Sequence, residues 1–148
     1  VELMVVGQVP PTFRQQVERQ SPDVWINWVG VSRREEVARI DRSAHVLFSA
    51  DLNAACPNSV IEALACGLPV VSYATGSLPE LISEDAGRVV PYGSNYWNLE
   101  LPQVGPLAAE ARAILSDQEC FRPGARARAE HAFGVERMVE QYYRVLTE

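Results

Sequence analysis

Short β-branched runs alternate with helical segments along the chain, and this alternation limits the possible folds more than any other feature of the sequence. Each run ends at a glycine or a polar turn, which is typical of a strand. Strands joined by helices across short links predict a parallel sheet. We therefore predict the α/β class, with a Rossmann-like parallel sheet and helices on both faces. The predicted strands are 1–6, 24–29, 44–49, 70–73 and 87–90, and the predicted helices are 12–20, 32–41, 58–66, 77–82, 107–115, 119–132 and 135–146.

The segments that follow the predicted strands define a candidate site. In parallel α/β sheets, ligands bind in the crevice outside the carboxyl ends of the strands. Gly7, Gly30, the loop 51–57 and the turn 75–76 each follow a predicted strand. We therefore expect these segments to share one edge of the sheet. Trp25 and Trp28, within the second strand, are expected to pack in the core.

The composition fits one ordered domain and excludes several classes of partner. The chain has 148 residues, of which 47% are hydrophobic, enough for a core. Its formal net charge of −6 and the lack of a basic stripe argue against nucleic acid as the main partner. An anionic small molecule stays compatible with this charge, because a local helix dipole can hold a phosphate. No apolar run is long enough to span a bilayer, and no signal peptide opens the chain.

The cysteines point to a reducing compartment. Cys56, Cys66 and Cys120 are odd in number and lack the spacing of metal ligands, so we interpret them as reduced thiols of a cytoplasmic protein. No metal site is expected, and neither a Ser-His-Asp set nor a Walker-type phosphate loop is present. The chain begins abruptly inside a predicted strand, which suggests a piece of a longer protein.

The predicted helix 58–66 carries a single charge, Glu62, among apolar residues that surround it nearly completely. Gly67 ends this helix and Pro69 prevents it from resuming. A carboxylate in a helix buried on most sides needs hydrogen-bond partners. In one interpretation Glu62 belongs to a capping box and accepts from the Ser59 backbone N–H. In the other, it binds a ligand. The residues alone leave both interpretations open.

The N-terminus of the same helix is the strongest candidate for a phosphate site. The free N–H groups near Asn58 and Ser59, together with the positive end of the helix dipole, favour an anion. Cys56, Pro57 and Asn58 are small enough to let a ligand approach. The turn 75–77 is a second candidate for holding an anion, with a plain strand-to-helix turn as the alternative. The residues themselves thus indicate a nucleotide- or phosphate-binding α/β domain.

The run 56–71, CPNSVIEALACGLPVV, followed by TGSLPELI at 75–82, resembles the signature of the retaining glycosyltransferases of family 4, which have the two-domain GT-B fold. Segments 5–7, 28–31 and 44–49 agree with this family in order and spacing, and 133–146 is similar to its final helix, which crosses back to the other domain. The resemblance implies that residues 1–148 form the C-terminal donor-binding domain. The first strand of that domain, a basic Arg…Lys pair and the N-terminal acceptor domain are absent.

The resemblance also implies a role for individual residues. Glu62 matches the second glutamate of the family's Glu-x7-Glu motif, which binds the ribose hydroxyls of a nucleotide diphosphate sugar. The N–H groups near Ser59 and Val60 match those that hold the diphosphate, and Gly30 and Val31 are expected to flank the base. No cofactor besides this donor substrate is implied. The predicted donor-binding residues are Glu62, Asn58, Ser59, Val60, Pro57, Gly30, Val31 and Gly7.

Residue 54 departs from the family pattern. The first glutamate of the motif belongs eight residues before Glu62, where this chain has Ala54. In the family that carboxylate lies beside the donor sugar, so the catalytic residues are left unassigned, although Asp51 or Asn53 is near in sequence. The expected function is hexosyl transfer by a longer enzyme, with the fragment alone inactive because it cannot orient both reactants. The alternatives are a degenerate nucleotide-binding module and an epimerase-type domain of GT-B fold. Membrane association is left open.

Overall fold

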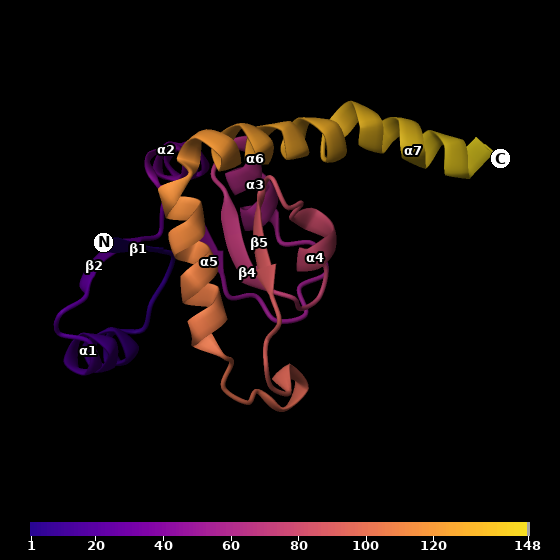
Figure 1. The fold of residues 1–148 in the computed structure, drawn as a ribbon. Coiled ribbons are helices and arrows are strands. Elements are labelled where there is room, and N and C mark those ends of the chain that lie inside the picture. The colour runs from indigo at the N-terminus through magenta and orange to yellow at the C-terminus, as the bar shows by residue number, and fades with distance from the viewer. Residues whose placement is uncertain (148) are drawn as a thin grey trace. The chain divides into compact units, whose positions relative to one another are not determined.

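The computed structural model describes residues 1–147 and divides the chain into two compact units. The first unit comprises Val1–Val37 and the second begins at Ala38 (Figure 1). Helix α2 (Arg34–Ser43) carries the chain from the first unit into the second.

The first unit is a two-stranded parallel sheet with one helix. Strand β1 (Glu2–Val6) pairs with β2 (Trp25–Gly30), and α1 (Pro11–Gln20) connects them. No residue in 1–37 is buried. Trp25 is 73% exposed, so the prediction that it packs in the core is wrong, whereas Trp28 is partly covered by the Arg14 guanidinium. A single pair of strands with one helix lacks a second apolar layer to cover the outer face of the sheet.

The second unit contains a three-stranded parallel sheet in the order β3-β4-β5, with β4 in the centre. Leu47 lies opposite Val70, and Val70 lies opposite Gly87. In Figure 1, α6 and α7 run along one end of this unit, and α7 projects beyond the sheet. The elements are β3 (Leu47–Ser49), α3 (Asn58–Ala65), β4 (Val70–Tyr73), α4 (Leu78–Leu81), β5 (Gly87–Val90), the 3₁₀ helix η1 (Tyr96–Asn98), α5 (Val104–Ser116), α6 (Gln118–Ala132) and α7 (Val135–Thr147).

The central strand β4 supplies side chains to two cores, one on each face of the sheet. Val70 packs in a cluster with residues of α3 and α6, including Val60, Leu64 and Ala125. Val71 packs in a second cluster that contains residues of α5, among them Ile114. Successive residues of a strand point to opposite faces, so the two clusters place helices on both faces of this sheet.

The predicted fold class is confirmed, with two differences. The five strands form two separate parallel sheets, of two and three strands. Strand β3 begins at Leu47, not at residue 44, because the Ala44 N–H still bonds to Ile40 O at 3.0 Å and ends helix α2. No helix among residues 1–147 is long and apolar enough to cross a membrane.

Candidate functional site

Helix α3 begins two residues earlier than a capping box at Ser59 requires. Pro57 is the N-cap and makes no side-chain hydrogen bond. Glu62 is therefore the fifth helical residue, whereas the carboxylate of a capping box belongs to the third. The interpretation in which Glu62 caps the Ser59 N–H is wrong.

The first two amides of α3 have no acceptor within the helix. The first intrahelical bonds are those of the Val60 N–H and the Ile61 N–H, which both donate to Pro57 O, at 3.1 and 3.4 Å. The amides of Asn58 and Ser59 precede them, at the positive end of the helix dipole. Val60 is fully buried and its N–H is already paired. An incoming anion thus meets the amides of Asn58 and Ser59 first.

Helix α3 is amphipathic, which corrects the expectation that it is buried on most sides. Val60, Ala63 and Leu64 are fully buried, whereas Asn58, Ser59 and Glu62 are exposed. Residues three and four apart share one face of a helix, so Glu62 lies on the same face as the two free amides. Its carboxylate needs no partner inside the protein because water solvates it. It is therefore available to accept hydrogen bonds from a ligand.

Sequence reasoning missed a second carboxyl group beside Glu62. Asp41, near the end of α2, is half-buried. Burial raises the pKa of its carboxyl group above the ordinary value, the negative charge of Glu62 raises that pKa further, and Arg42 lowers it by a smaller amount. The two helices also meet where the Cys66 thiol donates to Ala38 O at 3.7 Å. Hydrophobic periodicity carries no signal that the charge of Glu62 lies near enough to raise the pKa of Asp41.

We expect the variant Asp41→Asn to be more stable than the wild type at pH 7. The folded chain holds the Asp41 proton more tightly than the unfolded chain does. Stability therefore falls as the pH rises from the ordinary aspartate pKa of about 3.9 through the raised pKa. The amide does not ionise, so this fall is absent from the variant. Urea denaturation midpoints measured from pH 4 to pH 7 test this, and parallel curves for the two proteins contradict it.

The loop between β3 and α3 is bonded to the turn between β4 and α4. The Thr75 hydroxyl donates to Asp51 O, and both the N–H and the hydroxyl of Ser77 donate to Ala54 O, each at 3.0 Å. The structure thus brings together the two segments of this unit that were expected to share an edge. The hydroxyl protons of Thr75 and Ser77 are used within the protein, which favours the plain turn over an anion site.

The predicted residues of the first unit also lie together. The Gly7 N–H donates to Gly30 O at 2.8 Å, so the carboxyl ends of β1 and β2 meet. Both glycines have positive φ, 127° and 81°, a backbone conformation that other residues rarely adopt. Val31 follows and is 80% exposed. A role of Gly7, Gly30 and Val31 at the base of a nucleotide stays a prediction.

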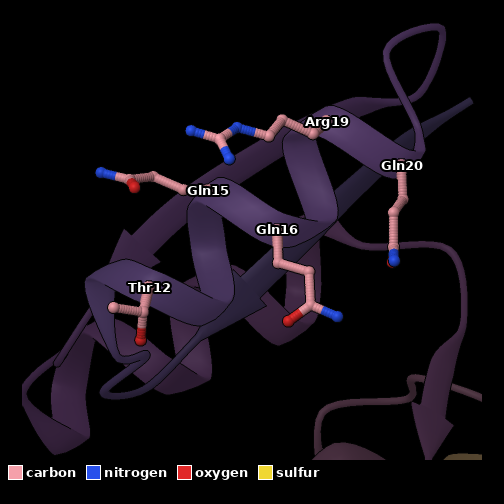
Figure 2. Close-up of a pocket in the computed structure, with 5 residues that line it drawn as sticks. All are labelled: Thr12, Gln15, Gln16, Arg19 and Gln20. Atoms are coloured by element: carbon pink, nitrogen blue, oxygen red, sulfur yellow. The ribbon is translucent and has the colours of Figure 1, made fainter.

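Two hollows on the surface contain none of the predicted donor-binding residues. One, of about 470 Å³, lies over α1, and the side chains that line it come from that helix alone (Figure 2). These side chains are Thr12, Gln15, Gln16, Arg19 and Gln20. The other, of about 320 Å³, lies in the second unit and is apolar, with Phe48, Tyr73 and Tyr92 among its lining residues. Residues 1–147 hold no group of three or more His, Cys, Asp or Glu side chains able to bind a metal ion.

Comparison with known proteins identifies the family. The sequence model of the family described as "Glycosyl transferases group 1" matches residues 1–99. The chain belongs to this family. This glycosyl transferase domain is also 33% identical over 86 residues to the GDP-mannose-dependent alpha-(1-6)-phosphatidylinositol dimannoside mannosyltransferase of Mycobacterium tuberculosis. That match covers 57% of the domain and 22% of the relative.

Solved structures agree with the fold of this glycosyl transferase domain. Sucrose-phosphate synthase from Thermosynechococcus elongatus superposes with a TM-score of 0.77 and 26% identity, over 97% of the domain and 38% of that chain. Anabaena HepE in complex with UDP-glucose superposes with a TM-score of 0.73 and 18% identity, over 97% of the domain and 40% of that chain. The domain therefore spans well under half the length of these proteins.

Proposed function

We propose that this glycosyl transferase domain binds the nucleotide diphosphate sugar donor of a retaining, hexosyl-type transferase of family 4. The observation that carries the proposal is the exposed face of α3, with two free amides on its first turn and the Glu62 carboxylate one turn further on. The amides favour an anion, whereas the carboxylate repels one and accepts from hydroxyl groups. A ligand that fits both is anionic at one point and carries hydroxyl groups beside it.

A nucleotide diphosphate sugar has this pattern, because its diphosphate is bonded directly to the ribose. Each helical residue advances about 1.5 Å along the axis, so Glu62 stands roughly 5 Å beyond the first amides. In the proposed complex, the amides of Asn58 and Ser59 hold the diphosphate, with Pro57 and Val60 beside them, and Glu62 accepts from the ribose hydroxyls. The base lies at Gly7, Gly30 and Val31, as the family resemblance implies, and no bound metal takes part.

Several features of the whole enzyme belong to the same proposal. Residues 1–148 are the C-terminal domain of a longer cytoplasmic protein whose N-terminal domain holds the acceptor. Helix α7 supports this, because its apolar side chains, including Met138, Tyr142 and Tyr143, are exposed and fit the helix that crosses back to that domain. The domain alone then holds a donor weakly and transfers no sugar at a useful rate, since both reactants need to be oriented together.

A transfer assay on the intact protein tests the proposed function. We expect calorimetry to detect binding of a nucleotide diphosphate sugar. GDP-mannose and UDP-glucose are the first donors to try, since the mycobacterial relative is described as GDP-mannose-dependent and HepE was solved in complex with UDP-glucose. We also expect transfer of a labelled sugar with its anomeric configuration retained. Inversion of that configuration contradicts the retaining mechanism, epimerised free donor favours the epimerase-type alternative, and failure of all donors to bind contradicts the proposal.

A degenerate binding module is the second candidate, and Ala54 is the observation that favours it. Ala54 is partly exposed, so a glutamate at this position has access to solvent. The assay therefore includes the variant Ala54→Glu. If the wild type transfers sugar and Ala54→Glu does not increase the rate, the result supports an active enzyme that uses another catalytic group. Transfer that appears only in Ala54→Glu supports a module that has lost its chemistry and kept its donor site.

A further inference from the structure

The turn after β4 holds the loop after β3 through three hydrogen bonds to two backbone carbonyls. Asp51 O accepts from the Thr75 hydroxyl, and Ala54 O accepts twice, from the N–H and the hydroxyl of Ser77. Thr75 is 1% exposed, so its hydroxyl has little contact with water. Asp51 and Ala54 are thus the two points at which the turn holds the loop before the chain enters helix α3 at Asn58.

Gly76, between the two donors, brings the backbones of the turn and the loop into close approach. Its φ is +55°, and a Cβ atom added there would lie 2.6 Å from Ala54 O and 2.8 Å from Ala54 N. These are backbone atoms, so a larger residue cannot be accommodated by rotating a side chain. On the loop side of this close approach, Asn53 also adopts the left-handed backbone conformation, with φ 58°. Glycine and asparagine are the residues that adopt such conformations most readily.

We propose that Thr75 and Ser77 are positioning residues for the donor site: they fix loop 51–57, and with it the first amides of α3 and residue 54. This inference rests on the proposed function. It adds two residues that do not contact the donor in the proposed complex. Helix α3, with the amides of Asn58 and Ser59 on its first turn, begins four residues after Ala54. Fixing the Ala54 carbonyl fixes their direction before a ligand arrives, which reduces the ordering cost of binding.

The hydroxyl groups of the two residues are the testable part of this arrangement. Ser77→Ala removes the hydroxyl bond to Ala54 O and leaves the N–H bond in place. In the intact protein we expect a donor Kd about three- to tenfold higher, measured by calorimetry, and faster amide hydrogen exchange in residues 51–57. Ser77→Thr retains a hydroxyl and should restore both values. Thr75→Val should act like Ser77→Ala, and Thr75→Ser like Ser77→Thr.

Ser83→Ala is the matched control. The Ser83 hydroxyl donates to the Asp85 carboxylate at 2.5 Å in the turn before β5. The variant therefore also loses one hydroxyl bond, but at the amino ends of the parallel strands β4 and β5, whereas Ser77 lies at their carboxyl ends. An equal loss of donor affinity in Ser83→Ala overturns the positioning role, and so do unchanged affinity and unchanged hydrogen exchange in Ser77→Ala. In either case, donor binding by the wild type still supports the proposed donor site. If the wild type binds no donor, the proposed function fails, and the positioning role fails with it.

Discussion

Replacing Glu62 with alanine is expected to weaken donor binding by the intact protein roughly 10- to 100-fold. Hydrogen bonds to a charged group contribute about 1.5–3 kcal/mol, and each 1.4 kcal/mol is about a factor of ten in Kd. The stability of the fold should hardly change, because the Glu62 side chain is exposed and α3 packs through Val60, Ala63 and Leu64. Calorimetric titration with the donor measures the first effect, and urea denaturation measures the second.

Two further variants separate recognition of the ribose from general effects of charge. Glu62→Gln keeps the shape and one acceptor oxygen, so its loss of affinity should be smaller than that of Glu62→Ala. Glu84→Ala removes another exposed carboxylate, in the connection between α4 and β5 at the amino end of that strand, and should leave donor affinity unchanged. Equal affinity of wild type and Glu62→Ala would exclude Glu62 from the donor site.

Much of the fold was predictable because the sequence marks its strand ends. Gly7 follows β1 and Gly30 is the last residue of β2, and both adopt positive φ at those positions. The apolar run at 70–73 matches β4, of which every residue is buried. Buried strands appear in the sequence as apolar runs, which can be recognised without knowledge of tertiary contacts. A strand end with positive φ favours glycine, because other residues rarely adopt that backbone conformation.

The local environment of Glu62 was less predictable. The sequence pattern Ser59-x-x-Glu62 fits a capping box, and an almost wholly apolar helix predicts burial on most sides. The first expectation fails because the helix begins at Asn58, which moves Glu62 from the third helical position to the fifth. The second fails because α3 packs against the rest of the unit through one face only, that of Val60, Ala63 and Leu64. Helix boundaries are set by local backbone geometry, and a shift of two residues is invisible to periodicity while it changes the partner of a side chain.

Tertiary contacts explain the other misses. Trp25 lies in a strand that sequence patterning places in a core, yet its side chain is 73% exposed and no residue in 1–37 is buried. The two strands and one helix of the first unit lack a second apolar layer that would cover this face of the sheet. The bonds from Thr75 and Ser77 to the loop that contains Ala54 join segments separated by more than twenty residues. A short turn of polar residues fits an anion site and a plain turn equally well until the acceptors of its hydroxyl groups are known.

In the observed geometry, the proposed donor-binding face of α3 and residue 54 are supported by different contacts. The face of α3 that carries Glu62 depends on the packing of Val60, Ala63 and Leu64 beneath it. The loop that contains Ala54 is held through its backbone carbonyl, which any residue at position 54 supplies. Loss of a carboxylate at this position therefore leaves both supports in place. This is why donor binding is expected whether or not the domain has kept its catalytic role.

The largest expected effect on stability is that of Leu64→Ala. Leu64 is 0% exposed and lies in the cluster that packs α3 against β4 and α6. Truncating a fully buried leucine costs about 2–5 kcal/mol, because the transfer free energy of the lost atoms is joined by the cost of a cavity. Domains of this size are stable by only about 5–15 kcal/mol. We therefore expect the thermal midpoint of the second unit to fall by on the order of 10 °C.

Leu115→Ala provides the matched control, since it makes the same substitution in helix α5 at a side chain that is 38% exposed. It leaves no closed cavity, so its midpoint should fall by much less, and calorimetric unfolding of the two variants gives the comparison. Similar midpoints for Leu64→Ala and Leu115→Ala would contradict the packing of α3 against the sheet. Because Leu64 lies directly beneath the exposed face that carries Glu62, Leu64→Ala should also weaken donor binding, whereas Leu115→Ala should not.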